Sequence, residues 1–233
     1  MEFKQFEDII ITSKAMLKID PTNAKIYANI ALSYQSLQKF EKAVLSYKKT
    51  ININPNYAEA YNNLGIILKE QGKLDEAIEA YNKALSVKPD YAEAYNNMGI
   101  ALKDQGKLNE AVEVYNKTLS LKPDYAEAYN NIGLVYKEQG NLEHVTEAYT
   151  KAISINPNYA EAYNNMGVTF KEQGKLDNAI EACSKALLIN PDYAEAHLNM
   201  GNTLQDQGKL EEAIEAYNKA LSIKPDYAEA YNN

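Results

Sequence analysis

Apolar and polar residues alternate along the chain with the period of amphipathic helices, as residues 58–91 illustrate. Apolar residues at helical spacing predict a first helix from Ala58 to about Gln71. Gly72 follows where a residue in the left-handed conformation would end that helix. A second helix is predicted from about Leu74 to Val87, and Pro89 ends it because proline lacks the amide and clashes with a continuing helix. The segment therefore predicts two antiparallel helices joined by a short turn.

The same pattern recurs every 34 residues. All ten glycines fall into five pairs, and successive pairs are 34 residues apart. A fixed period of this size indicates a stacked array of like units rather than one globular domain. All 19 tyrosines occupy four positions of the repeat, which is typical of aromatic packing in a core or seam. The prolines lie on the same lattice, at Pro21, Pro55, Pro89, Pro123, Pro157, Pro191 and Pro225.

The recurring residues resemble the tetratricopeptide repeat, whose period is also 34. In residues 58–91 the residues that carry the resemblance are Tyr61, Leu64, Gly65, Ala77, Tyr81, Ala84 and Pro89. The resemblance implies an all-α fold, a right-handed α-solenoid of antiparallel helix pairs in which the first helix of each repeat lines the concave side. The predicted full repeats are residues 24–57, 58–91, 92–125, 126–159, 160–193 and 194–227, preceded by a lone second helix in 1–23 and followed by a truncated seventh repeat in 228–233.

Charge and composition exclude several classes of partner. The formal net charge is −8, and all 24 strongly basic side chains are lysines. Binding to nucleic acid requires a dense cationic surface, so we expect no nucleic-acid partner. No stretch approaches 18 uninterrupted apolar residues, so we expect no membrane span, and a cytoplasmic location is the default expectation.

The residues that carry chemistry are sparse. A single cysteine, Cys183, excludes an internal disulfide framework and cysteine-rich zinc sites. The two histidines, His144 and His197, are 53 residues apart and have no cysteine near them in sequence. The sequence therefore predicts no catalytic residues, no metal site, no cofactor and no enzymatic activity.

Candidate binding residues follow from the resemblance, which places repeat positions 2, 5, 6, 9, 12 and 13 of the first helices in the concave groove. The sixth position is always asparagine, the fifth is asparagine in most repeats, the ninth is aliphatic until the last full repeat, and the twelfth is lysine in the middle four. The candidate partner-binding residues are Asn29, Asn63, Asn97, Asn131, Asn165 and Asn199 at position 6, Asn62, Asn96, Asn130 and Asn164 at position 5, and Lys69, Lys103, Lys137 and Lys171 at position 12.

An asparagine row suits an extended polypeptide, because each carboxamide offers donors and an acceptor to a peptide backbone without selecting a side chain. The arrangement is similar to the asparagine ladder of O-linked N-acetylglucosamine transferases. The alternative interpretation is that the asparagines satisfy neighbouring helices or remain solvated. The second position is glutamate at Glu59, Glu93, Glu127, Glu161 and Glu195, so we expect the groove to repel the acidic C-terminal tails that chaperone-binding relatives of this fold accept.

The sequence thus predicts a protein–protein interaction scaffold that binds extended segments in a concave groove. One alternative is the substrate-recognition part of a larger glycosyltransferase-like enzyme. Another is a scaffold that assembles end to end, because the lone helix in 1–23 and the stub in 228–233 are complementary halves of one repeat.

Overall fold

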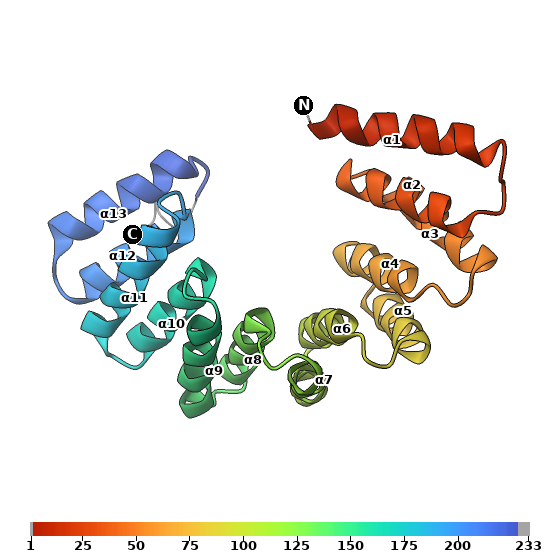
Figure 1. Ribbon diagram of the computed structural model, residues 1–233. Helices are drawn as coiled ribbons and strands as arrows, with labels where there is room; N and C mark the ends of the chain where they lie inside the picture. Colours follow the sequence, from red (N-terminus) through yellow and green to blue (C-terminus); the bar gives the residue numbers. More distant parts are fainter. Residues whose placement is uncertain (1, 228–233) are drawn as a thin grey trace. The chain divides into compact units, whose positions relative to one another are not determined.

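The structure, a computed structural model, describes residues 2–227, and every regular element among them is an α-helix (Figure 1). The chain divides into two compact units, residues 1–122 and 123–233. The first contains α1 (Glu2–Leu17), α2 (Ala24–Ser36), α3 (Phe40–Ile53), α4 (Ala58–Glu70), α5 (Leu74–Val87), α6 (Ala92–Asp104) and α7 (Leu108–Leu121). The second contains α8 (Ala126–Glu138), α9 (Leu142–Ile155), α10 (Ala160–Glu172), α11 (Leu176–Ile189), α12 (Ala194–Asp206) and α13 (Leu210–Ile223).

Consecutive helices pair as hairpins, with the closest packing between α2 and α3, α4 and α5, α8 and α9, and their equivalents. Within each unit the second helix of one pair also packs against the first helix of the next. This stacking confirms the predicted all-α solenoid of helix pairs. The lone helix expected in 1–23 is α1, which packs on α2. The stub expected in 228–233 lies outside the described residues.

The turn inside each hairpin is closed by a residue in the left-handed conformation. At the end of α4, Gly72 has φ +73°, its N–H donates to the Lys69 carbonyl at 2.9 Å, and the Lys73 N–H donates to the Leu68 carbonyl at 2.9 Å. These two bonds form a Schellman motif, which satisfies carbonyls that the helix leaves without partners. The first hairpin makes the same turn with Gln38, a residue with a Cβ, at φ +54°.

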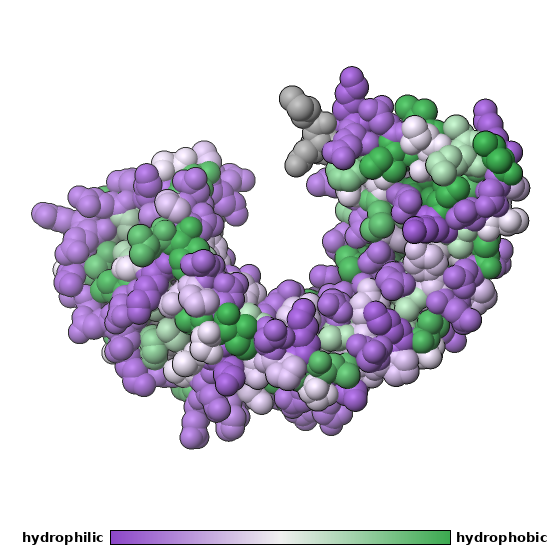
Figure 2. Space-filling model, in the orientation of Figure 1, coloured by the Kyte–Doolittle hydropathy of each residue, from purple (hydrophilic) through white to green (hydrophobic). Residues whose placement is uncertain are grey.

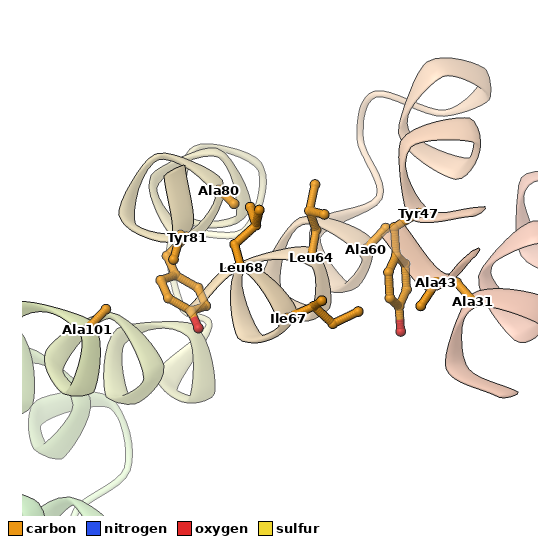
Figure 3. Close-up of a cluster of buried hydrophobic side chains, with 11 residues drawn as sticks. Ala31, Ala43, Tyr47, Ala60, Leu64, Ile67, Leu68, Ala80, Tyr81 and Ala101 are labelled. Atoms are coloured by element: carbon orange, nitrogen blue, oxygen red, sulfur yellow. The ribbon is translucent and has the colours of Figure 1, made fainter. Parts of the chain in front are cut away.

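The core of four of the hairpins is built from a glycine in the first helix and a tyrosine in the second. A Cβ on Gly65 would lie 2.6 Å from Cε1 of Tyr81, so only glycine lets the ring pack flat against the helix backbone. Figure 3 shows Tyr47 and Tyr81 among aliphatic side chains of α2, α3, α4 and α6. In the fifth repeat Cys183 takes the tyrosine place opposite Gly167, and burial raises the pKa of its thiol to about 12. Cys183 is therefore a packing residue.

The visible surface is mostly hydrophilic, with apolar side chains in small separate patches (Figure 2). None of the described helices combines the length and apolarity needed to cross a bilayer.

Candidate functional site

The sixth-position asparagines remain accessible on the first helices. Asn29 is exposed, and the others from Asn63 to Asn199 are half-buried. One helical turn further along each helix, the ninth-position aliphatic side chains are also open: Leu32 is 46% exposed, and Ile66 and Ile100 are half-buried. The accessible face of the first helices therefore carries one amide per repeat and, until the sixth repeat with Asn202, one aliphatic side chain per repeat.

The fifth-position asparagines lie elsewhere than the sequence analysis placed them. Their exposed fractions are 4% for Asn62, 1% for Asn96, and 0% for Asn130 and Asn164. They are buried at the junctions between successive repeats, and their accessible surface is too small for direct contact with a partner. The reason is that positions 5 and 6 are neighbours on a helix, and the next helix pair covers only one of them.

Three of the junctions are held by hydrogen bonds between asparagines of successive repeats. Nδ2 of Asn97 donates to Oδ1 of Asn62 at 3.0 Å. In the second unit, Nδ2 of Asn165 donates to Oδ1 of Asn130 at 3.0 Å, and Nδ2 of Asn199 donates to Oδ1 of Asn164 at 2.9 Å. These bonds satisfy buried amides that would otherwise be costly to desolvate.

The second-position glutamates complete the junctions of the second unit. Nδ2 of Asn130 donates to Oε1 of Glu161 at 3.2 Å, and Nδ2 of Asn164 donates to Oε1 of Glu195 at 3.4 Å. Both glutamates are exposed and stand in the first turn of their helices, where the helix dipole favours a negative charge.

A half-buried tyrosine from the preceding loop lies beside each of these glutamates. Burial raises the pKa of Tyr159, the carboxylates of Glu161 and Glu127 raise it further, and a hydrogen bond with the Asn130 side chain lowers it. Burial likewise raises the pKa of Tyr193, with Glu195 and Glu161 adding to the shift. Glutamates at the second position of two successive repeats thus both raise the pKa of each loop tyrosine.

Sequence reasoning assigned these loop tyrosines to packing and missed their acidic surroundings. The recurring order Tyr-Ala-Glu at the start of each first helix was the available signal, for example at Tyr159 and Glu161. It was uninformative without the structure, because only the stacking of repeats brings in the second glutamate.

Three of the twelfth-position lysines, Lys103, Lys137 and Lys171, lie in ion pairs with acidic residues of position 13. Nζ of Lys137 is 3.0 Å from Oε1 of Glu172, and Nζ of Lys171 is 3.1 Å from Oδ2 of Asp206, in both cases in the next repeat. Lys103 pairs with its own neighbour Asp104 at 3.2 Å. Such partly exposed pairs contribute at most about 1 kcal/mol each, so they order the lysines more than they stabilise the fold.

The hydroxyls of the core tyrosines differ in whether they have a hydrogen-bond partner. The Tyr47 hydroxyl donates to Oε1 of Gln35 at 3.0 Å, and the Tyr217 hydroxyl lies within hydrogen-bond distance of two acceptors, Oδ1 of Asn202 at 2.9 Å and Oε1 of Gln205 at 3.1 Å. Glutamine stands at position 12 in those two repeats. Where lysine stands there instead, the hydroxyls of Tyr81 and Tyr149 are buried without a hydrogen-bond partner.

Among the described residues no group of histidine, cysteine and carboxylate side chains is placed to hold a metal ion. The chemistry that the first-helix surface offers is therefore amide, aliphatic and carboxylate contact with another molecule.

Sequence models of two kinds match the chain. A model described as TPR repeat matches residues 33–72, 66–106 and 101–140. Models described as tetratricopeptide repeat match residues 126–159 and 158–226. Together these matches run from residue 33 to residue 226. No curated protein matches the chain in sequence.

Solved structures with the same fold include Cut9 bound to Hcn1 from the APC/C, with a TM-score of 0.83 at 18% identity over 97% of this chain. The chain spans 45% of the length of that relative. YrrB, described as a TPR protein with an unusual peptide-binding site, is 26% identical, with a TM-score of 0.58 over 80% of this chain and 96% of its own. MamA is 31% identical, with a TM-score of 0.61 over 71% of this chain and 96% of its own.

Proposed function

The chain belongs to the tetratricopeptide-repeat family, and we propose that it is a non-enzymatic scaffold that binds extended segments of partner proteins along its first helices. Proteins of this fold are typically interaction modules, and the family match supports that broad role. The proposal that the bound segment is extended and lies along the first helices is the more specific step.

The observation that carries this proposal is the pairing of amide and aliphatic groups on that surface. Asn97, Asn165 and Asn199 each donate one N–H to a buried asparagine, which fixes the orientation of the carboxamide. A second N–H and the Oδ1 oxygen of each remain available, because a carboxamide has two donors and an acceptor. A fixed donor and acceptor in each of these three repeats suit a peptide backbone, and the ninth-position aliphatic residues suit apolar side chains of the same segment.

The remaining candidate residues have supporting parts in this proposal. Asn62, Asn130 and Asn164 accept hydrogen bonds from sixth-position asparagines and orient them, Asn96 is buried at the equivalent place, and the lysines of position 12 border the surface. The likeness to YrrB is consistent with peptide binding, since that protein is described by its peptide-binding site. The repeat boundaries and the cytoplasmic location stay predictions. The transferase-fragment and end-to-end assembly alternatives gain no support from the comparisons.

The test is a selection of displayed random peptides against the whole chain, followed by binding measurements on two double variants. Ile66→Asn with Ile100→Asn changes the aliphatic row, and asparagine is what the sixth repeat already carries there, at Asn202. The matched control is Ile11→Asn with Leu45→Asn, which are 66% and 69% exposed on second helices. We avoid alanine at Asn97 or Asn165, because it would leave a buried asparagine oxygen without its donor.

We expect selected peptides to lose at least about tenfold in affinity for the first variant, which corresponds to about 1.4 kcal/mol, and to bind the control normally. Peptides that bind both variants like the parent would place the binding surface elsewhere and contradict the proposal.

A further inference from the structure

The loop tyrosines and the glutamates beside them form a recurring cluster. The repeats differ in whether a lysine of the chain itself lies over the tyrosine ring of the cluster. We use the term tyrosine–glutamate cluster for Tyr159 with Glu127 and Glu161, and for Tyr193 with Glu161 and Glu195. Each cluster combines the face of an aromatic ring with two carboxylates. Both components attract cations, the ring through its quadrupole and the carboxylates through their charge.

In other repeats the chain itself places a lysine in this position. Nζ of Lys88 lies 4.5 Å from the ring centroid of Tyr91, whose pKa is raised by burial and by Glu59 and Glu93. Nζ of Lys224 lies 4.6 Å from the ring centroid of Tyr227. These distances are within the range of cation–π attraction, so a lysine ammonium fits beside a loop tyrosine of this kind.

The fourth and fifth repeats lack that internal lysine. The residues equivalent to Lys88 and Lys224 on the 34-residue lattice are Asn156 and Asn190. In the described part of the chain no ammonium lies over the ring of Tyr159 or Tyr193, and no ion pair engages Glu161 or Glu195. Asn130 and Asn164 donate hydrogen bonds to Glu161 and Glu195, so a carboxylate of each cluster is held in place.

The net charge of the molecule is concentrated in the same unit. Residues 123–233 carry 17 acidic side chains against 8 lysines, whereas residues 1–122 carry 15 against 16. The second unit therefore attracts a positively charged partner at long range, and the first unit does not.

We propose that the two tyrosine–glutamate clusters bind lysine or arginine side chains of the partner, and that the segment bound by the second unit is therefore basic. This inference rests on the proposed function, because it names the chemistry of the segment that the scaffold binds. The partner's cation takes the place that Lys88 and Lys224 take in their own repeats.

The test restores the missing internal lysines. Asn156→Lys with Asn190→Lys gives the fourth and fifth repeats the residue that the second and sixth already carry, so the variant is expected to fold. The matched control is Thr150→Lys with Ser184→Lys, which adds the same charge at exposed positions of α9 and α11. The probe is a fluorescent peptide of about twelve residues alternating lysine and serine, with a glutamate–serine peptide as the negative control, measured by anisotropy at low salt.

We expect the lysine probe to bind the parent and to lose about tenfold in affinity for the Asn156→Lys, Asn190→Lys variant, since two cation–π and ion-pair contacts are blocked. The charge control is expected to lose less than about threefold, because it affects only the screened long-range attraction. Lys88→Asn, which empties the equivalent place beside Tyr91, is expected to strengthen binding.

Equal losses in the two lysine variants, or no loss in either, would overturn the inference, as would failure of the probe to bind the parent. Its failure is separable from that of the proposed function. In one outcome, selected peptides lose affinity for the Ile66→Asn, Ile100→Asn variant and bind the Asn156→Lys, Asn190→Lys variant like the parent. That result would support the proposed function and contradict the inference that the bound segment is basic. A lysine probe that binds the clusters, while no selected peptide depends on Ile66 and Ile100, would support the inference of a basic segment and contradict the proposed binding along the first helices.

Discussion

Tyr47 and Tyr81 occupy equivalent places in successive repeats, yet their hydroxyls have different surroundings. Gln35 accepts the hydrogen bond of the Tyr47 hydroxyl. The second repeat has Lys69 at the position equivalent to Gln35, and there the Tyr81 hydroxyl is buried without a hydrogen-bond partner. A buried hydroxyl without a partner is unfavourable by about 1–3 kcal/mol relative to one that is hydrogen-bonded. Residues of one type in one register therefore differ in what they contribute to stability.

Replacing each of these tyrosines with phenylalanine tests that difference. We expect Tyr81→Phe to leave the free energy of unfolding unchanged or to raise it by up to about 1 kcal/mol, because it removes a polar group without a partner. Tyr47→Phe is expected to lower it by about 0.5–1.5 kcal/mol, because Gln35 loses its donor. Urea unfolding followed by circular dichroism measures both, and equal effects would contradict the account.

The buried tyrosines also predict a stability that falls at alkaline pH. Burial raises the pKa of Tyr47, Tyr81 and Tyr149 above the ordinary value of 10.0, and burial raises that of the Cys183 thiol to about 12. A group whose pKa is higher in the folded state contributes its full stability below its unfolded pKa and loses it as pH rises. We expect stability to decline from about pH 9 for the thiol and from about pH 10 for the tyrosines, by about 1.4 kcal/mol per group and pH unit.

Urea unfolding between pH 7 and pH 11 checks this decline, with tyrosinate absorbance recorded in parallel. The absorbance of the buried tyrosines is expected to appear only with the loss of helical signal. Full tyrosinate absorbance in a folded protein at pH 10.5 would rule out the burial effect.

The burial of the asparagines could be predicted from the sequence only in part. The 34-residue register placed Asn62 and Asn63 correctly on the first helix, and the helical period places both near its inner face. Which of the two becomes buried depends on the approach of the next helix pair, which the residue pattern does not encode. The alternative interpretation is that asparagines make hydrogen bonds to neighbouring helices. It applies to Asn62, Asn130 and Asn164 at position 5, whose partners are asparagine side chains of the next repeat rather than helix backbone.

At the scale of the helix, the first hairpin differs from the others in how α2 ends. Gln38 holds φ +54° where Gly72 holds +73°, and a Cβ makes the left-handed conformation unfavourable by roughly 1 kcal/mol. The helix bounds predicted within residues 58–91 agree with those of α4 and α5 within a residue, since Gly72 ends the first helix and Pro89 follows the second. Glutamine does not by itself favour a positive φ, so the conformation of Gln38 follows only from its position 34 residues before Gly72.

Gln38→Gly is expected to raise the free energy of unfolding by roughly 1 kcal/mol, because it removes the strain without removing a contact in the core. The reciprocal Gly72→Gln is expected to lower it by a similar amount. Thermal unfolding of the two variants beside the parent measures both shifts, and a Gln38→Gly variant that melts earlier would show that the glutamine side chain stabilises the turn in another way.

At the scale of the whole molecule, stability depends on junctions between repeats rather than on one central core. Solenoid stability is approximately a sum of repeat terms and nearest-neighbour terms, and the asparagine bonds belong to the second kind. Asn164 is fully buried and bonds two side chains of the next repeat, since it accepts from Asn199 and donates to Glu195.

Asn164→Ala is expected to weaken that junction by about 1–3 kcal/mol and to speed amide hydrogen exchange in α12 and α13, with α8 and α9 unchanged. The control is Asn218→Ala, an exposed position of α13. Exchange that accelerates evenly through all the described helices would show that the unit opens as one block and contradict the junction account.

The asparagine bonds have a further consequence at the level of the gene. Donor and acceptor of each bond are 35 residues apart, one repeat plus one residue, and the same two asparagines recur in most repeats. If recombination deleted residues 160–193, Asn199 would stand where Asn165 stood and would find Asn130 as its new acceptor. Unequal crossing-over between the near-identical coding repeats can therefore shorten or lengthen the array in whole units without leaving a buried amide unmatched. A single recombination event can therefore change the length of the binding surface without changing the side chains that each repeat presents.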